Sequence, residues 1–153
     1  MIKDAYEELT KRFKMLPPFG DVDNEFEVST LESEQFLLRG IKKRIAERLE
    51  DAGGFLGDIL HPSSEGMALM YEYRFISQKE KRHVLLMFKK VQFYIRSFSE
   101  ADLIQDDEVD AKLIAEVSKV WKEIRKECVP LARLLKEAWV KETDYKEDLG
   151  YLG

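Results

Sequence analysis

The sequence predicts an all-α fold, a helical bundle of four to six helices, on three observations. Apolar residues recur every three or four positions along most of the 153 residues, which is the period of an amphipathic helix. Charged residues make up 36% of the chain, against roughly 25% in an average globular domain, and this surplus suits helices with charged outer faces. Strand-like sequence is confined to the short stretch 26–28.

The N-terminal residues predict one helix followed by one loop. Apolar side chains share one face of residues 1–16, and Pro17-Pro18 must end a helix there because proline cannot continue it. The acidic stretch 19–28 has the composition of a surface loop.

A first long helix is predicted over about residues 31–60. Ser29 and Glu32 form a capping-box pattern at its start. The apolar period then continues without a change of phase through Gly53-Gly54. Two helical glycines cost about 1 kcal/mol each relative to alanine. The sequence therefore predicts a kink or a close backbone contact at this point, with a stop and a second helix as the alternative.

A second long helix is predicted over about residues 107–140, with an apolar stripe close to a heptad from Leu113 to Ala138. Pro130 lacks a backbone donor, and it predicts a kink or a break. The two long helices can pair antiparallel within one chain. The alternative is that their stripes reach another copy, which predicts self-association.

Two further helices are predicted between the long ones. A shorter helix can be capped by Ser63 or Ser64, and a longer one opens at a second capping-box pattern, formed by Ser77 and Glu80. Residues 99–107 then predict an acidic connection.

The length of the chain predicts one helical domain over residues 1–142, with a core large enough to need no disulfide or structural metal. Residues 143–153 show no helical period and predict a flexible acidic C-terminal tail. That tail is open to interpretation as a disordered end, as a docking peptide, or as a strap that folds back on a basic helix.

Composition limits the cellular compartments and the classes of binding partner that we expect for this protein. Cys128 is the only cysteine, which indicates a reducing compartment and favours the cytoplasm. The charged N-terminus has no apolar targeting region, and no window is apolar enough to span a membrane, so we expect no membrane partner. The formal net charge of −5 argues mildly against broad, non-specific nucleic-acid binding.

A metal site is only weakly indicated. Asp58 and His61 are three residues apart, as are Glu80 and His83, and this spacing places both side chains of a pair on one helix face, as in dimetal-carboxylate bundles. A complete site would also need carboxylates from two further helices, and Glu80 already has a capping role. We therefore predict no metal and no cofactor.

Catalytic signatures are missing from the sequence. Cys128 lies on the apolar stripe of its helix and is interpreted as a buried, inert thiol. Phosphate-binding, dinucleotide-binding and hydrolase motifs do not occur. An enzyme is not the favoured class, and we name no catalytic residue.

The clearest non-random feature is a basic cluster from Arg74 to Arg96, which contains seven basic residues and one acidic residue, with phenylalanines between them. A second basic group lies at residues 39–48. Such residues either solvate an outer helix face or form a surface for a phosphate backbone or an acidic partner. The candidate contacts are Lys79, Arg82, Lys89, Lys90, Arg96, Arg39, Lys42 and Lys43.

These observations favour a non-catalytic helical interaction or assembly subunit, which acts through its basic helical face, its acidic tail, or both. We expect a protein partner or self-association. The first alternative is a nucleic-acid-binding component of a nucleoprotein complex, and the second is a dimetal-carboxylate helical-bundle enzyme.

Overall fold

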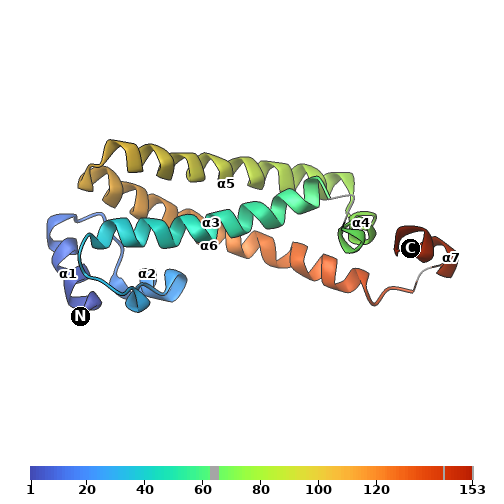
Figure 1. The fold of residues 1–153 in the computed structure, drawn as a ribbon, viewed down its shortest axis with the longest axis horizontal. Coiled ribbons are helices and arrows are strands. Elements are labelled where there is room, and N and C mark those ends of the chain that lie inside the picture. Colours follow the sequence, from blue (N-terminus) through green and yellow to red (C-terminus); the bar gives the residue numbers. More distant parts are fainter. Residues whose placement is uncertain (63–65, 143, 153) are drawn as a thin grey trace. The chain divides into compact units, whose positions relative to one another are not determined.

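The computed structural model describes residues 1–62, 66–142 and 144–152. In these ranges the chain forms α-helices and one 3₁₀ turn, without a strand (Figure 1). The elements are α1 (Ile2–Arg12), α2 (Phe19–Phe26), η1 (Val28–Thr30), α3 (Leu37–Leu60), α4 (Met67–Tyr73), α5 (Gln78–Ile104), α6 (Asp107–Ala138) and α7 (Tyr145–Leu152). The predicted all-α helical bundle is confirmed, and α5 joins α3 and α6 as a long helix.

The backbone divides into two compact units, which we call unit 1 and unit 2. Unit 1 comprises Met1–Asp51 and Gln92–Glu123, and unit 2 comprises Ala52–Val91 and Ile124–Gly153. Each of α3, α5 and α6 contributes residues to both units. The single domain over residues 1–142 and the flexibility of the tail stay predictions.

The apolar positions that share a helical face in the sequence are buried in the structure. In unit 1, Ile41, Ile45 and Leu49 of α3 are inaccessible to solvent. In unit 2, Val84 and Val91 of α5 are equally inaccessible. Within the described ranges, no helix combines the length and the apolar character that crossing a membrane requires.

The predicted loop over residues 19–28 is wrong, because this stretch forms α2 and η1. Val22 and Phe26 are spaced as neighbours on a helix, and both are fully buried. The burial of this apolar pair outweighs the acidic composition on which the loop prediction relied. The preceding helix also ends earlier than predicted, at Arg12, since Phe13 leaves the helical backbone with φ −115° and ψ 88°.

The predicted capping box at Ser29 is wrong as well. The Ser29 amide donates instead to Asp23 Oδ1 at 2.7 Å, and α3 begins only at Leu37. Phe36 precedes it with φ 54°, and its carbonyl accepts hydrogen bonds from the amides of Arg39 and Gly40. A carboxylate six residues earlier in the chain thus took the backbone donor that the capping box required.

The second capping box is confirmed. The Ser77 amide donates to Glu80 Oε1 at 3.0 Å, and the Glu80 amide donates to Ser77 Oγ at 3.1 Å. The proposed caps at Ser63 and Ser64 lie outside the described residues.

Neither the glycine pair in α3 nor the proline in α6 breaks its helix. Helix α3 continues through Gly53-Gly54, and α6 continues through Pro130. A Cβ atom added to Gly54 would meet no heavy atom within 4 Å, so no close neighbour explains this glycine. The nearest approach is at Gly57, where a Cβ would lie 3.4 Å from Phe88 Cε2. Kinks at Gly53-Gly54 and Pro130 stay predictions.

Two connections are more helical than the sequence predicts. Helix α5 extends to Ile104, so the acidic link to α6 shrinks to Gln105 and Asp106. Asp106 Oδ1 accepts hydrogen bonds from two amides in the first turn of α6, at 2.8 and 3.1 Å. Asp144 caps α7 in the same manner. This cap explains why a helix forms in the C-terminal segment although its sequence has no apolar period.

Replacing Gln105 with glycine is expected to stabilise the fold by about 0.5–1 kcal/mol. Gln105 follows α5 in the left-handed region, at φ 58°, which a residue without a Cβ adopts at no steric cost. Urea denaturation of the variant measures the gain. The matched control is Gln92→Gly inside α5, which is expected to destabilise by about 1 kcal/mol. A loss of stability in the Gln105 variant would contradict the argument.

Candidate interaction surfaces

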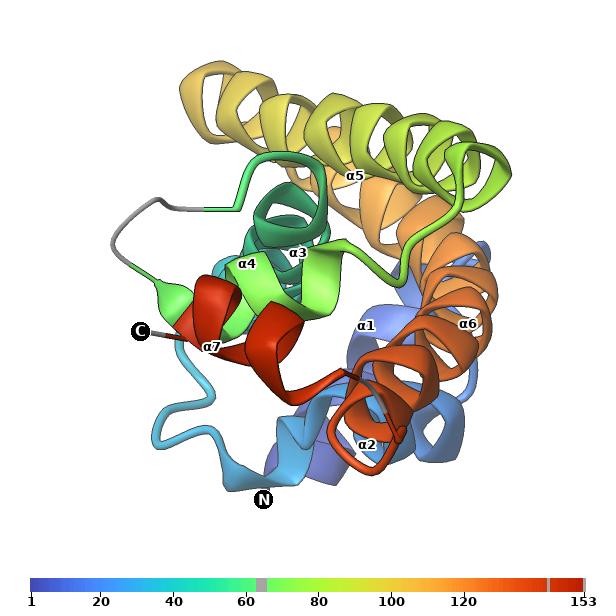
Figure 2. The same ribbon diagram turned by 90° about the vertical axis from the view of Figure 1, so that its right-hand side faces the viewer.

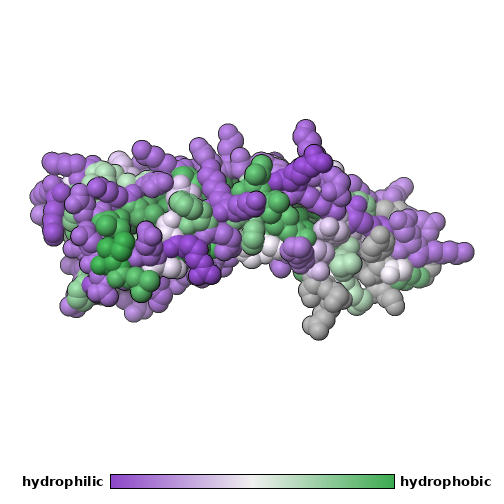
Figure 3. All heavy atoms as spheres, turned by 90° about the horizontal axis from the view of Figure 1, so that it is seen from above, coloured by the Kyte–Doolittle hydropathy of each residue, from purple (hydrophilic) through white to green (hydrophobic). Residues whose placement is uncertain are grey.

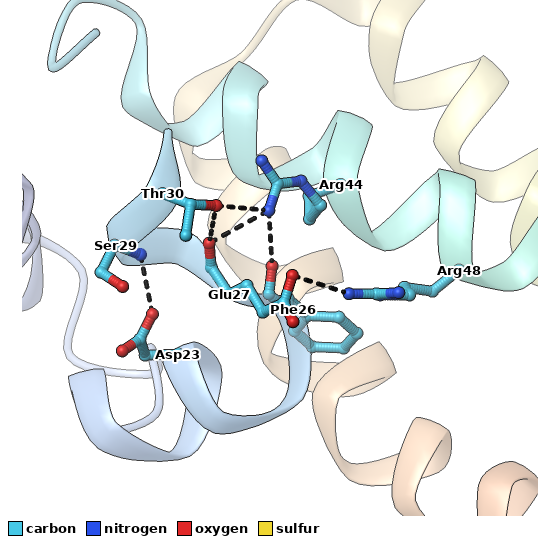
Figure 4. Close-up of polar contacts among 7 residues, drawn as sticks. All are labelled: Asp23, Phe26, Glu27, Ser29, Thr30, Arg44 and Arg48. Atoms are coloured by element: carbon cyan, nitrogen blue, oxygen red, sulfur yellow. Dashed lines mark hydrogen bonds and ion pairs between the residues drawn. The ribbon is translucent and has the colours of Figure 1, made fainter. Parts of the chain in front are cut away.

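The second basic group, on α3, is largely committed to contacts within unit 1. Arg44 Nη1 donates to the carbonyl oxygens of Phe26 and Glu27 at 3.1 and 3.0 Å, and to Thr30 Oγ1 at 2.9 Å (Figure 4). The last carbonyls of a helix have no partner within it. Arg44 therefore caps the C-terminus of α2, and Arg48 adds an ion pair to Glu27 at 3.3 Å (Figure 4).

Lys42 is buried, with 4% of its surface exposed, and does not belong with the exposed contacts that the sequence predicted. Its Nζ donates to Asp102 Oδ1 of α5 at 2.7 Å. It also lies 2.9 Å from Asp110 Oδ1 of α6, in an ion pair that lacks hydrogen-bond geometry. In the described part of the chain this buried oxygen accepts no hydrogen bond. Lys42 thus joins three helices of unit 1 through charge.

Arg39 and Lys43 are the members of this group that stay on the surface as predicted. Both are exposed, and the Arg39 guanidinium lies 4.6 Å from the ring centre of Phe36. They border a hollow of about 430 Å³, whose walls come from α3 and from Phe98 and Asp102 of α5.

The basic cluster on α5 behaves differently from the group on α3. Within unit 2, Lys79, Arg82, Lys89 and Lys90 are all exposed. Among the described residues, Lys79, Arg82 and Lys89 form no ion pair and no hydrogen bond, whereas Lys90 has a partner within the chain. The side chains of Lys79, Arg82 and Lys89 are therefore available to a partner in a way that those of Lys42 and Arg44 are not.

Exposed leucines, which are not among the predicted contacts, also lie within this cluster. Leu86 is 67% exposed and Leu85 is 41% exposed, whereas Val84 and Met87 on either side of them are buried. Figure 3 shows hydrophobic groups exposed among hydrophilic ones on one face of the molecule. The signal was present in the sequence, because both leucines are out of phase with the buried stripe of α5. We call Lys79, Arg82, Leu85, Leu86, Lys89 and Lys90 the basic-leucine face.

Arg96 lies on the part of α5 that belongs to unit 1 and is exposed, as predicted for a contact residue. One turn before it, Phe93 is 65% exposed and its ring packs edge-on against Tyr94 at 5.2 Å. Of the aromatic residues interleaved with the basic cluster, Phe93 is the one with an exposed ring, since Tyr94 and Phe98 are buried and Phe75 and Phe88 are half-buried.

The weak metal candidates are not brought together. Glu80 serves the capping box, and His83 Nε2 lies 3.9 Å from Glu127 Oε2 on α6. Asp58 and His61 are exposed near the end of α3. In the ranges that the structure describes, no three histidine, cysteine, aspartate or glutamate side chains gather so as to hold a metal ion.

Cys128 is half-buried on α6. Burial, together with the neighbouring charge of Glu127, raises the pKa of its thiol. A raised pKa keeps the sulfur protonated at neutral pH and opposes a nucleophilic role.

The C-terminal segment lies against α4 in unit 2 (Figure 2). Glu147 of α7 forms an ion pair with Arg74 at 3.3 Å, and the Arg74 guanidinium lies 4.6 Å from the ring centres of Tyr71 and Phe75. Tyr71 in turn stacks on Trp139 at 4.6 Å. Through Glu147 the acidic segment therefore contacts Arg74, the first residue of the basic cluster.

The structure separates the predicted contact residues into an internal set, at Lys42, and an exposed set, on α5 and at Arg39 and Lys43. Comparison of the chain with protein-family models, curated proteins and solved structures finds no match.

Proposed function

We propose that this protein is a non-catalytic interaction subunit, which binds an acidic, amphipathic segment of a protein partner through the basic-leucine face of α5. The observation that carries the proposal is the exposure of Leu86 beside Arg82 and Lys89, which have no partner of opposite charge among the described residues. Single exposed leucines are ordinary. An exposed leucine pair beside Lys79, Arg82 and Lys89, which have no partner among the described residues, is less common, and it matches the composition of a helix-binding surface.

The energetics of such a face support a protein partner. Covering the exposed part of each leucine would contribute on the order of 1 kcal/mol. The cations would attract an acidic segment, speed its approach and set its orientation, although each exposed ion pair contributes little to affinity. The basic-leucine face therefore favours a partner helix that carries both apolar and acidic side chains on the face it presents.

Nucleic acid is the alternative ligand, and exposed Phe93 beside Arg96 is the observation in its favour. Leucine side chains, however, add little to the binding of a phosphate backbone. The dimetal-carboxylate alternative has no comparable support among the described residues.

The single cysteine leads us to propose the cytoplasm as the compartment.

We expect a labelled peptide with leucine and glutamate at helical spacing to bind the protein in a salt-dependent manner, as measured by fluorescence anisotropy. Arg82→Glu/Lys89→Glu is expected to weaken this binding at least about tenfold, because it replaces attraction by repulsion. Leu86→Ser is expected to weaken it several-fold by removing apolar area. Single-stranded DNA serves as the second probe.

Lys119→Glu/Lys122→Glu provides the matched control, since it makes the same charge change at exposed positions of α6. Binding that the control weakens as much as the α5 variant would show attraction by net charge alone and contradict the proposal. Binding of DNA that depends on Arg82 and Lys89 but not on Leu86 would favour the nucleic-acid alternative instead. Failure of the peptide to bind would also overturn the proposal.

A further inference from the structure

The outer face of α3 in unit 1 carries a seam with sorted charges. Arg39, Lys43, Ala46 and Glu50 follow one another at spacings of four, three and four residues, which places them in one line along the helix. Glu47 lies beside this line. The four charged residues are exposed, and Ala46 at the middle is half-buried. Cations occupy the first half of the seam and carboxylates occupy the second.

These charges are not used inside the chain. Among the described residues, Arg39, Lys43, Glu47 and Glu50 form no side-chain ion pair and no side-chain hydrogen bond, and the Arg39 guanidinium lies over the ring of Phe36. Arg39 also lies in the first turn of α3, where a cation opposes the helix dipole. Lys42 is compensated by Asp102 and Asp110, but Arg39 and Lys43 are not.

The seam borders open space. The hollow of about 430 Å³ beside it is lined by the four residues of the seam, by Lys42 and Glu47 of α3, and by Phe98 and Asp102 of α5. Ala46 is the smallest side chain in the seam and lies near its middle. A small residue at this position lets a second helix backbone approach closely.

We propose that the α3 seam is a self-association surface, and that its occupant is the α3 seam of a second copy in antiparallel orientation. Antiparallel pairing about a two-fold axis midway between Lys43 and Ala46 places Arg39 of each copy opposite Glu50 of the other, and Lys43 of each copy beside Glu47 of the other. The surface is therefore complementary to itself, as a two-fold interface requires. A parallel pairing would instead bring like charges together.

The expected dimer is weak and sensitive to salt. The seam covers twelve residues, from Arg39 to Glu50, which is about 18 Å of helix. A contact of this length belongs to the small, transient class of interfaces. Its charged pairs lie at the rim, where salt screens them strongly.

Charge exchange tests the pairing directly. Arg39→Glu/Lys43→Glu makes the seam wholly acidic, and Glu47→Lys/Glu50→Lys makes it wholly basic. Each variant alone is expected to raise the dissociation constant of the homodimer by at least about tenfold in sedimentation equilibrium at low salt. An equimolar mixture of the two is expected to form a heterodimer at least as stable as the wild-type dimer, since every pair is again of opposite charge.

The mixture also shows that both variants are folded, because only folded seams can restore association. Lys119→Glu/Lys122→Glu is the control and is expected to leave the wild-type dissociation constant unchanged within a factor of about two. A wild-type protein that stays monomeric at high concentration would overturn the proposal. A dimer that survives both exchanges, or a mixture that fails to restore association, would equally exclude antiparallel α3 pairing.

Discussion

Replacing Lys42 with methionine is expected to lower the free energy of unfolding by about 3–5 kcal/mol. The change leaves the carboxylate of Asp110 buried without its cation, and one of its oxygens already accepts no hydrogen bond among the described residues. An uncompensated buried charge is among the few causes of such large losses. Urea denaturation followed by circular dichroism measures the effect.

Two further variants show whether the buried charge is the cause. Lys42→Met/Asp110→Leu removes both ions and is expected to recover most of the lost stability, because apolar pairs often replace buried ion pairs without cost. Lys11→Met removes the same side chain from an exposed ion pair with Glu8 and is expected to change stability little. A double variant no more stable than Lys42→Met would show that packing, rather than charge, is what the lysine provides.

Arg44→Met is expected to lower the free energy of unfolding by roughly 1–2 kcal/mol. It removes the donor that the Phe26 and Glu27 carbonyls share at the end of α2 (Figure 4). Part of this site is accessible to water, which lowers the cost below that of a fully buried donor. The measurement is again urea denaturation.

Lys43→Met is the matched control, because it changes a neighbouring exposed cation on the same helix and is expected to have little effect. Hydrogen exchange of the α2 amides adds a local readout, since Arg44→Met should reduce their protection and Lys43→Met should not. Equal effects of the two substitutions would mean that Arg44 does not hold the end of α2.

The sequence was sufficient to predict the helical class and most of the extent of α3 and α6, because these depend on local and periodic information. The apolar periods of α3 and α6 continue through Gly53-Gly54 and Pro130, and so do the helices. The capping box at Ser77 and Glu80 formed as predicted, since both of its hydrogen bonds lie within four residues.

Where a prediction was wrong, a contact with a residue outside the predicting pattern had taken precedence. The same capping pattern at Ser29 did not form, because Asp23 accepts the hydrogen bond of its amide. Helix α2 formed in an acidic stretch because Phe26 is buried, with its ring 6.1 Å from that of Trp121 on α6. Neither partner is identifiable from the local pattern.

The candidate contacts show the same division. The sequence identified the basic residues of α3 and α5 but could not distinguish Lys42 from Lys43, which are neighbours with the same chemistry. One is buried against Asp110 and the other is exposed, because successive residues of a helix differ by about 100° in direction. Composition and periodicity thus determined which side chains the helices carry. Only the tertiary structure decided which of those charges are neutralised inside and which remain outside, because that depends on where distant carboxylates come to lie.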